Sequence, residues 1–546
     1  YNVSYFNIQN IPTSYYFTTY ISYLRNTMLK TTPHGEKMSA KSIVKGTVIF
    51  AVSGILCRIM GFIFRIYISR IMPASQIGMY QMVMPVCVLG QAAAVGGLST
   101  AVTKYTAAYF AQKKKDKGYI NFLATLLYCT AVSVITALLI AKNAALISKI
   151  FLSGSLCTSL LIITAYSLPF ACIHSVISSY FIGLELHLLP AAAQVTEQII
   201  RITCVFTFAG IAEQNGSTPD ASTALYGILA GEIGSSLFCF IAVIFLKNKY
   251  KTEETALVRT PLYYISEGIL QLAVNYRLAL PITANRVCLH LIQSFEAVLL
   301  PMMLMTCGQS SEDALTTYGV LTGMTMPLVL FPATFTNAMS QALLPDISKS
   351  WQTGNLSRLN KSMNLALTLA CNLGIMCIPG FFFYGAGFGG IIFDNSEVIS
   401  QVRLMGLICP VVFLSTPLSS ALNAIGKSGT VFISSLIAHL INLAIVVFII
   451  PRTGINGYCC GLIISHLFVC LYMMWLLKKI TGCSYSVKTL AAAPVMRSLI
   501  CFFATIPVYT TLHRAGSLSE ALCLLLGGGS YILACIVSYI FMHDMK

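Results

Sequence analysis

Charged residues are scarce in this sequence, where only 10% of the 546 residues are Asp, Glu, Lys or Arg. A soluble protein of this length would carry about 25% charged residues. Hydrophobic residues make up 56% of the chain, and they come in runs of the roughly 20 residues that a helix needs to cross a bilayer. The composition excludes a soluble globular protein and predicts an all-α integral membrane protein with many spans.

Acidic residues are the rarer kind of charge, since 18 Asp and Glu face 34 Lys and Arg and leave a net charge of +16. A basic protein can bind nucleic acid, but such a surface interleaves Lys and Arg with aromatic side chains. Here the lysines cluster in short loops between apolar runs. We therefore expect membrane lipids and no nucleic acid as partners, and we interpret the positive charge as an orientation signal.

Catalytic and metal-binding motifs are also missing. The sequence contains no Walker A loop, no G-x-S-x-G and no H-E-x-x-H. Its 19 cysteines form no C-x-x-C pair, and most of them lie inside apolar runs, where cysteine usually acts as a small buried hydrophobe. We therefore predict a protein that is not an enzyme and has no cofactor and no metal ligands.

Apolar periodicity predicts about fourteen transmembrane helices. The expected spans are 43–70, 78–109, 119–141, 155–184, 189–211, 221–246, 276–304, 314–343, 359–385, 398–424, 429–450, 455–477, 489–512 and 517–542. Residues 1–40 are rich in Tyr, Thr and Ser, and we expect a poorly ordered extension in which Met28 and Met38 are candidate start residues.

The loop charges predict which side of the membrane each loop faces. Lysines gather in every second loop, as in 113–117, 247–259 and 478–488, whereas the intervening loops 213–221 and 307–313 carry no Lys or Arg. Loops on the cytoplasmic side carry the excess of Lys and Arg. We therefore predict a multi-pass protein of the cell membrane with both termini in the cytoplasm.

Two pairs of segments suggest an internal duplication. MVMPVCVL (82–89) is similar to MTMPLVLF (324–331), and PFACIHSVISS (169–179) is similar to PVVFLSTPLSS (410–420), at nearly the same offset. Parallel repeats of this kind form two-lobed transporters. The predicted organisation is an N-terminal extension 1–40, an N-lobe 41–247, a cytoplasmic linker 248–275, a C-lobe 276–480 and two appended helices in 481–546.

Arginines lie deep in the first predicted span, CRIMGFIFRIYISR (57–70). Arg58 and Arg65 are two helical turns apart and fall on one face. A charge in a membrane span costs about 2.5–3.5 kcal/mol on insertion scales, so each is a candidate site residue. Arg70 lies elsewhere around the helix near its end, where a long side chain can reach the interface. The span contains no acid that could pair with these cations.

Polar residues also share one face of the fifth predicted span, QVTEQIIRI (194–202). Glu197 and Arg201 are spaced i,i+4, the spacing at which helical side chains meet. Gln194 and Gln198 continue the same stripe. Two interpretations remain open: a self-neutralised structural pair, or a part of a substrate site.

The seventh predicted span carries a polar seam in NRVCLHLIQSFEA (285–297). Arg286, His290 and Gln293 follow the helical period, and Glu296 continues it. We expect this seam to line a cavity, although a lone buried histidine is more often a packed core residue. The eighth span adds Asn337 and Gln341.

The excess of arginine over acid inside the membrane predicts a cavity of positive potential. The planar fork of a guanidinium suits a phosphate or diphosphate. A bound diphosphate would offset the cost of keeping Arg58 and Arg65 at membrane depth. The candidate substrate-binding residues are Arg58, Arg65, Glu197, Gln198, Arg201, Arg286, His290, Gln293, Glu296 and Asn337.

Three stretches resemble the stage V sporulation protein B family: KGTVIFAVSGILCRIMGFIFRIYISRIMPASQIGMYQM (45–82), SSYFIGLELHLLPAAAQVTEQIIRI (178–202) and YGVLTGMTMPLVLFPATFTNAMSQALLPDIS (318–348). The resemblance extends over nearly the whole chain after about residue 40. That family belongs to a superfamily of polysaccharide exporters, lipid II flippases and multidrug and toxin extrusion proteins.

The resemblance implies fourteen helices in two lobes and an alternating-access cycle. It also implies a saccharide carried on undecaprenyl diphosphate as substrate, as in synthesis of cell-wall or spore-cortex peptidoglycan. In lipid II flippases, arginines of the first helix line the central cavity. Arg58 and Arg65, on either side of Gly61–Phe62, resemble them.

Two other functions remain open at this point. A cation-coupled multidrug exporter would bind organic cations and a proton or sodium ion through buried carboxylates, for which Glu197, Glu232 and Glu296 are the candidates. A membrane scaffold for cell-wall enzymes would need a docking module, and the loops are short. We expect a monomer whose coupling ion, if it uses one, is a proton or sodium.

Overall fold

The computed structural model describes residues 40–151, 157–247, 261–482, 486, 488–515 and 519–544. The chain divides into two units, Tyr1–Gly46 and Thr47–Lys546, and the architecture below is that of the second unit. Of the expected extension 1–40, all but residue 40 lies outside the described residues, as does 248–260 of the expected linker.

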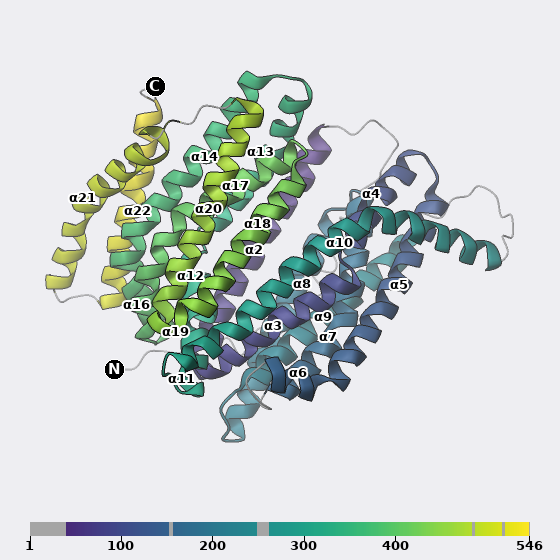
Figure 1. The fold of residues 1–546 in the computed structure, drawn as a ribbon, viewed down its shortest axis with the longest axis horizontal. Coiled ribbons are helices and arrows are strands. Elements are labelled where there is room, and N and C mark those ends of the chain that lie inside the picture. The colour runs from purple at the N-terminus through teal and green to yellow at the C-terminus, as the bar shows by residue number, and fades with distance from the viewer. Residues whose placement is uncertain are drawn as a thin grey trace, which may run out of the picture. The chain divides into compact units, whose positions relative to one another are not determined.

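Across the described ranges, thirteen helices are long and apolar enough to span a membrane, and a bent pair raises this number to fourteen. The expected all-α membrane fold, with two six-helix lobes and two appended C-terminal helices, is therefore confirmed. Figure 1 shows the blue helices on one side and the green and yellow helices on the other, with the purple α2 drawn alongside the green ones.

The N-lobe is built around α7, which contacts α3, α4, α5 and α9, while α8 packs along α9. Its helices are α2 (Ala40–Ile71), α3 (Ala74–Ala94), α4 (Leu98–Ala111), α5 (Lys115–Lys142), α6 (Ala144–Phe151), α7 (Thr158–Gly183), α8 (Leu188–Gln214) and α9 (Ala221–Lys247).

The C-lobe is built around α17, which contacts α13, α14 and α20. Its elements are the C-terminal part of α10 (Pro261–Thr306), α11 (Ser311–Gly319), η3 (Val320–Thr325), α12 (Met326–Val329), α13 (Ala333–Gln352), α14 (Leu356–Pro379), η4 (Gly380–Gly385), α15 (Ala386–Phe393), α16 (Glu397–Met405), η5 (Gly406–Ile408), α17 (Cys409–Ala424), α18 (Ser428–Phe448), α19 (Ile450–Thr453) and α20 (Ile455–Thr481).

The last helices pair with each other and with the outside of the C-lobe. They are η6 (Lys488–Ala492), α21 (Ala493–Ala515) and α22 (Glu520–Asp544). An aromatic cluster joins α21 and α22 to η4, since the hydroxyl of Tyr531 donates to the carbonyl of Met376 and its ring lies near Tyr384. These helices contact α14 and η4 rather than the N-lobe.

The expected span 78–109 is wrong in one respect, because the helix breaks at Val95–Gly97 into α3 and α4. Gly96 adopts a φ of +33°, which a side chain would strain, and a Cβ on Gly97 would meet the Ala279 carbonyl oxygen at 2.4 Å. The amide of Gly97 donates to Thr283 Oγ1 over 2.8 Å. The broken segment therefore packs directly against α10. The Thr283 side chain of α10 accepts the hydrogen bond that the Gly97 amide would otherwise donate within a helix.

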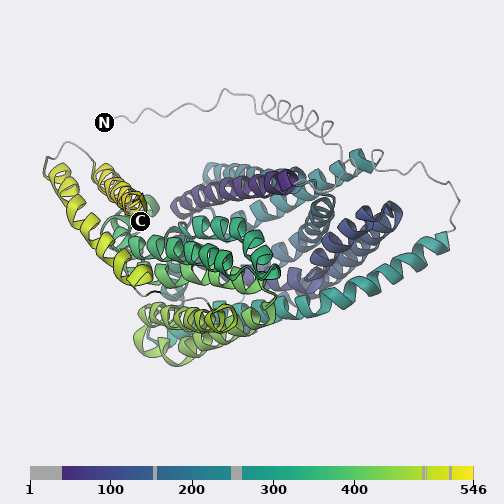
Figure 2. The same cartoon turned by 90° about the horizontal axis from the view of Figure 1, so that it is seen from above.

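The expected linker also differs from the structure, because residues 261–275 belong to α10. This part of α10 is tied to α5, where the Asn275 amide donates to Asn121 Oδ1 at 2.7 Å and to Thr125 Oγ1 at 2.8 Å. Asn275 and Asn121 are fully buried. One continuous helix therefore connects the lobes, and Figure 2 shows its extended course in teal.

Bent and widened helices occur on the C-lobe side, where proline interrupts the apolar runs. The helical segments Ser311–Val329 and Ala333–Gln352 meet at an angle of 54°. The short break between them ends at Pro332. Upstream of this bend, η3 forms a π-helical segment, in which backbone carbonyls lose their usual partners. The same segment borders the cavity described below.

Candidate functional site

A cavity of about 480 Å³ lies between α2, α8 and the η3–α13 segment. Its volume falls within the range of about 300–1,000 Å³ that small-ligand sites occupy. It is lined by Arg58, Gly61, Phe62, Phe64, Arg65, Ile68, Tyr80, Gln198, Arg201, Thr322, Met326, Pro327, Leu330, Phe331 and Thr334. Both lobes therefore contribute to its wall.

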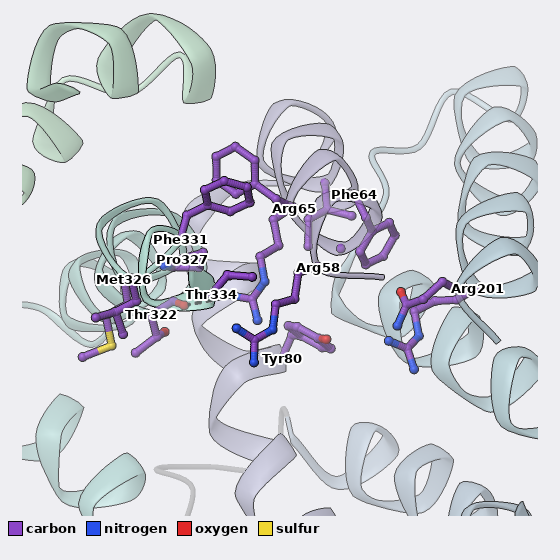
Figure 3. A pocket seen from close by; sticks show the side chains of 15 residues that line it. Arg58, Phe64, Arg65, Tyr80, Arg201, Thr322, Met326, Pro327, Phe331 and Thr334 are labelled. Atoms are coloured by element: carbon purple, nitrogen blue, oxygen red, sulfur yellow. Dashed lines mark hydrogen bonds between the residues drawn. The ribbon is translucent and has the colours of Figure 1, made fainter. Parts of the chain in front are cut away.

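Arg58 and Arg65 both line this cavity from α2, and Figure 3 shows their side chains extending to the same side. Arg65 Nη1 donates to the carbonyl of Thr322 at 3.3 Å. Thr322 lies in η3, so the wide π-helical turn supplies the acceptor that anchors this arginine. Arg58 is exposed and also lines the cavity, whereas Arg65 is half-buried.

Arg70 does not behave as the membrane anchor expected from its position. Its Nε donates to the carbonyl of Ile392 at 2.7 Å and its Nη2 to that of Ile391 at 3.0 Å. These carbonyls belong to the last turn of α15, where the helix dipole favours a cation. Arg70 therefore caps a C-lobe helix and fixes the end of α2 against it.

The cavity wall formed by α8 presents Gln198 and Arg201. Figure 3 shows Arg201 on the neighbouring helix across from the arginines of α2. Among the lining residues within the described ranges there are three arginines and no carboxylate. Most of the other lining residues are apolar, including Phe62 and Phe331, whose ring centroids lie 5.2 Å apart. The lining is thus cationic and aromatic.

Arg201 also takes part in a group of buried charges that we call the N-lobe cluster, formed by His174, Glu197, Arg201 and Glu232. Arg201 Nη2 donates to Glu197 Oε1. His174 Nδ1 lies 3.8 Å from Glu197 Oε2 and 3.6 Å from Glu232 Oε2. These side chains are 13–18% exposed, so water screens them little.

Small residues on α9 allow this close approach. A Cβ on Gly231 would meet the Glu197 carbonyl oxygen at 3.0 Å and the Arg201 Cβ at 3.3 Å. The backbone of α9 therefore lies directly against the charged face of α8, as small residues permit in membrane helices. The segment GEIGSS, which also carries Glu232, supplies this contact surface.

The polar seam of α10 is brought together, but it forms a separate C-lobe network of Gln293, Glu296, His439, Asn442 and Tyr458. Glu296 is 8% exposed and accepts hydrogen bonds from the Asn442 amide at 2.5 Å and from the Tyr458 hydroxyl at 2.8 Å. His290 Nδ1 contacts Gln293 Oε1 at 2.9 Å, and Gln293 Nε2 lies 3.3 Å from His439.

The structure therefore places His290, Gln293 and Glu296 outside the cavity lining, against α18 and α20. The helical period had grouped them correctly. Helical periodicity alone does not distinguish a face that lines a cavity from a face that packs against polar side chains of a neighbouring helix.

Arg286 and Asn337 are not among the cavity-lining residues either. Arg286 Nη1 donates to the carbonyl of Gly96 at 2.8 Å, which makes it a partner for the broken end of α3. Asn337 lies on α13 one turn beyond the lining residue Thr334. Sequence reasoning missed the roles of Gly96 and of His174, because an isolated Gly or His in an apolar run carries no distinctive pattern.

The two lobes touch closely where α3 and α11 begin. A Cβ on Gly78 would lie 2.2 Å from the Leu315 carbonyl oxygen, and one on Gly319 would lie 2.1 Å from the Ala74 carbonyl oxygen. Only glycine permits this backbone-to-backbone contact. These contacts join α3 to α11 beside the lining residues Tyr80 and Thr322.

Comparison with known proteins agrees with this architecture. A polysaccharide biosynthesis protein family matches residues 43–351. Stage V sporulation protein B of Bacillus subtilis (strain 168) is 25% identical over 457 residues, which cover 83% of this chain and 87% of that protein. Lipid II flippase MurJ of the same organism is 23% identical and covers 82% of this chain and 85% of its own length.

Solved structures show the same fold. A lipid II flippase MurJ in an inward closed conformation superposes with a TM-score of 0.64 at 16% identity, covering 91% of this chain and 99% of the other. An inward-facing multidrug resistance MATE family transporter superposes with a TM-score of 0.60 at 14% identity, covering 79% and 96%. The cationic cavity thus lies in a transporter fold, and the chain belongs to the polysaccharide biosynthesis protein family, in its stage V sporulation protein B-like branch.

Proposed function

We propose that the chain is an alternating-access flippase for a saccharide carried on a polyprenyl diphosphate such as undecaprenyl diphosphate. The observation that carries this proposal is the cavity lining, in which Arg58, Arg65 and Arg201 converge and the described residues provide no carboxylate. Such a site selects a multivalent anion, because guanidinium groups bind phosphate oxygens in bidentate fashion.

The apolar part of the lining suits the remainder of this substrate. Phe62, Phe64 and Phe331 present flat surfaces beside the arginines, and aromatic faces pack against sugar rings as readily as against other apolar groups. The cavity of about 480 Å³ has room for a headgroup, whereas the long prenyl chain stays in the surrounding bilayer. The substrate is thereby recognised by its diphosphate and by its first sugars.

The close contact of Gly78 and Gly319 supports an alternating cycle. In the proposed cycle, the backbone contact between α3 and α11 acts as the closed gate, so a headgroup in this state enters and leaves at the opposite end. With the termini in the cytoplasm, as the loop charges predict, this state opens toward the cytoplasm. Separation of α3 from α11 would then release the headgroup on the other side.

A multidrug exporter is the less favoured function, although the fold is shared. Organic cations need carboxylates or aromatic faces free of competing cations, and here three guanidinium groups border the space. Glu197 faces Arg201, and Glu296 is held by Asn442 and Tyr458. The lining therefore repels the substrates that such an exporter must bind.

The test is to deplete the protein and identify the polyprenyl-linked intermediate that accumulates in the inner leaflet. Restored export by the wild-type chain and loss of export in Arg65→Ala at equal membrane abundance are the expected results. Arg497→Ala is the matched control, because Arg497 lies on α21 away from the cavity. Full export by Arg65→Ala would reject the proposed site.

A further inference from the structure

The N-lobe cluster contains more negative than positive charge at a buried position. Glu197 and Glu232 supply two carboxylates, Arg201 supplies one guanidinium, and His174 lies between them. Glu232 Oε2 is buried without a hydrogen-bond partner, as is Arg201 Nε. An unmatched buried carboxylate is costly, and two neighbouring carboxylates relieve the cost by sharing one proton.

Arg201 connects this cluster to the cavity. The same side chain that binds Glu197 also lines the space between the lobes, with Gln198 beside it. Arg201 Nε is a donor without a hydrogen-bond partner in the described structure, so the guanidinium keeps donor capacity that an anion can use. An anion in the cavity therefore competes with Glu197 for Arg201.

We infer that the N-lobe cluster is a proton-uptake site whose occupancy is set by anion binding in the cavity. When a diphosphate engages Arg201, Glu197 loses its cation partner while still facing His174 and Glu232. One proton from water then enters the cluster and is shared among these three groups. Release of the anion returns Arg201 to Glu197 and expels the proton. This inference rests on the proposed function of the cavity.

The charged groups nearest to the cluster on the cavity side are Arg58 and Arg65 of α2, which line the same space as Arg201 and would bind the same anion. The other titratable groups around the cluster are thiols. These groups are Cys57 on α2, Cys87 on α3, Cys172 on α7 and Cys239 on α9. Ser235 Oγ lies 3.2 Å from His174 Nδ1 and provides a neutral partner within the same helix turn as Glu232.

A resident metal ion fits the cluster less well than a proton. The ligand atoms of His174, Glu197 and Glu232 lie within 4.8 Å of one another. However, Arg201 already occupies one carboxylate of the set and would repel a metal cation at this distance. A proton adds no new ligand geometry and can be shared among the groups as they stand.

The inference is tested with the full-length chain in detergent and farnesyl diphosphate as the probe. Calorimetric titration at pH 7 in two buffers of different ionisation enthalpy gives the number of protons taken up per bound probe. We expect uptake of about one proton by the wild type. In Glu197→Gln, where Arg201 is already free, we expect binding about tenfold tighter and uptake reduced to near zero.

The matched control is Glu296→Gln, which changes a buried carboxylate outside the cluster and should leave proton uptake as in the wild type. Binding of the probe to Glu197→Gln shows that the variant is folded. Wild-type binding without proton uptake, or equal uptake in Glu197→Gln, would overturn this inference and leave the flippase proposal intact. No binding to the wild type would instead overturn the proposed function, and the inference with it.

Discussion

The two lobes bury glutamates in opposite ways. Glu296 in the C-lobe network receives hydrogen bonds from Asn442 and Tyr458 and is closed off from the cavity. In the N-lobe cluster, Glu197 is paired with Arg201, which also faces the cavity, and Glu232 lies 3.6 Å from His174 Nδ1. Glu296 also has His439 Nδ1 3.8 Å from its Oε2, but all of these partners lie away from the cavity. A carboxylate enclosed in this way is fixed, whereas one paired with a cation that also faces the cavity can respond to a ligand.

This difference matters because both arrangements look alike in sequence. Each is a glutamate in an apolar helix with polar residues one turn away. Glu296 is bound by residues of other helices, whereas Glu197 pairs with Arg201 of its own helix. These partners decide whether the charge is fixed or exchangeable. The following experiments compare the lobes directly.

The largest effect is expected from Glu296→Ala. It removes a charged acceptor and leaves Asn442 and Tyr458 buried without it, at a cost of about 3 kcal/mol. Glu232→Ala is the counterpart, and because Glu232 Oε2 has no hydrogen-bond partner, its loss should cost at most about 1 kcal/mol. Thermal unfolding of both variants in detergent checks this order, and equal losses would contradict the distinction between the lobes.

The next prediction compares two arginines with different surroundings. Arg201 lines the cavity, whereas Arg286 lies outside its lining. Arg201→Ala should weaken farnesyl diphosphate binding by about tenfold to hundredfold, because it removes a charged hydrogen-bond donor from the cavity. Arg286→Ala should leave binding unchanged, since Arg286 donates to the Gly96 carbonyl instead. Calorimetric affinities decide between them, and a similar loss in both would place Arg286 in the site.

A smaller effect is expected at the contact between α3 and α11. Gly319→Ala places a methyl group 2.1 Å from the Ala74 carbonyl oxygen, and overpacking of this kind costs about 1–3 kcal/mol. The closed state should lose population, so a cysteine introduced at Leu315 should react faster with a water-soluble maleimide. Gly429→Ala is the control, because nothing lies within 4 Å of that position. An unchanged labelling rate would refute the closure.

The smallest effects are expected when one neutral partner is removed from each group of charges, Tyr458 in the C-lobe network and Ser235 beside the N-lobe cluster. Tyr458→Phe removes one of the hydrogen bonds to Glu296 and should lower the unfolding free energy by about 1 kcal/mol. Ser235→Ala removes the neutral partner of His174, and we expect a change below about 0.5 kcal/mol with a measurable change in proton uptake. If Ser235→Ala destabilised the protein more, the N-lobe cluster would be structural as well.

The fold and the arginines of the cavity could be predicted because they depend on local periodicity. Arg58 and Arg65 recur on one helical face, and the structure places both in the cavity with Gln198 and Arg201. A charged side chain that faces lipid hydrocarbon is costly, so this face of the helix is expected to turn toward the protein interior.

The remaining site residues could not be placed, because periodicity gives a face and not its neighbour. Glu296 finds its partners on α18 and α20, far along the chain. His174 and Glu232 meet Glu197 only because Gly231 lets α9 approach α8. Likewise, the break at Gly96 depends on Thr283 and Arg286 from α10, and no local signal announces it.

The continuous α10 has a mechanical consequence for any rocking of the lobes. Upstream, Asn275, Thr283 and Arg286 hold this helix to the N-lobe. Downstream, Gln293 and Glu296 hold it to α18 and α20. The stretch 287–292 lies between these two sets of attachments. If the lobes change orientation, the helix must therefore bend within this stretch, which is shorter than two helical turns. In the proposed alternating-access cycle, this short segment would be the pivot between the lobes.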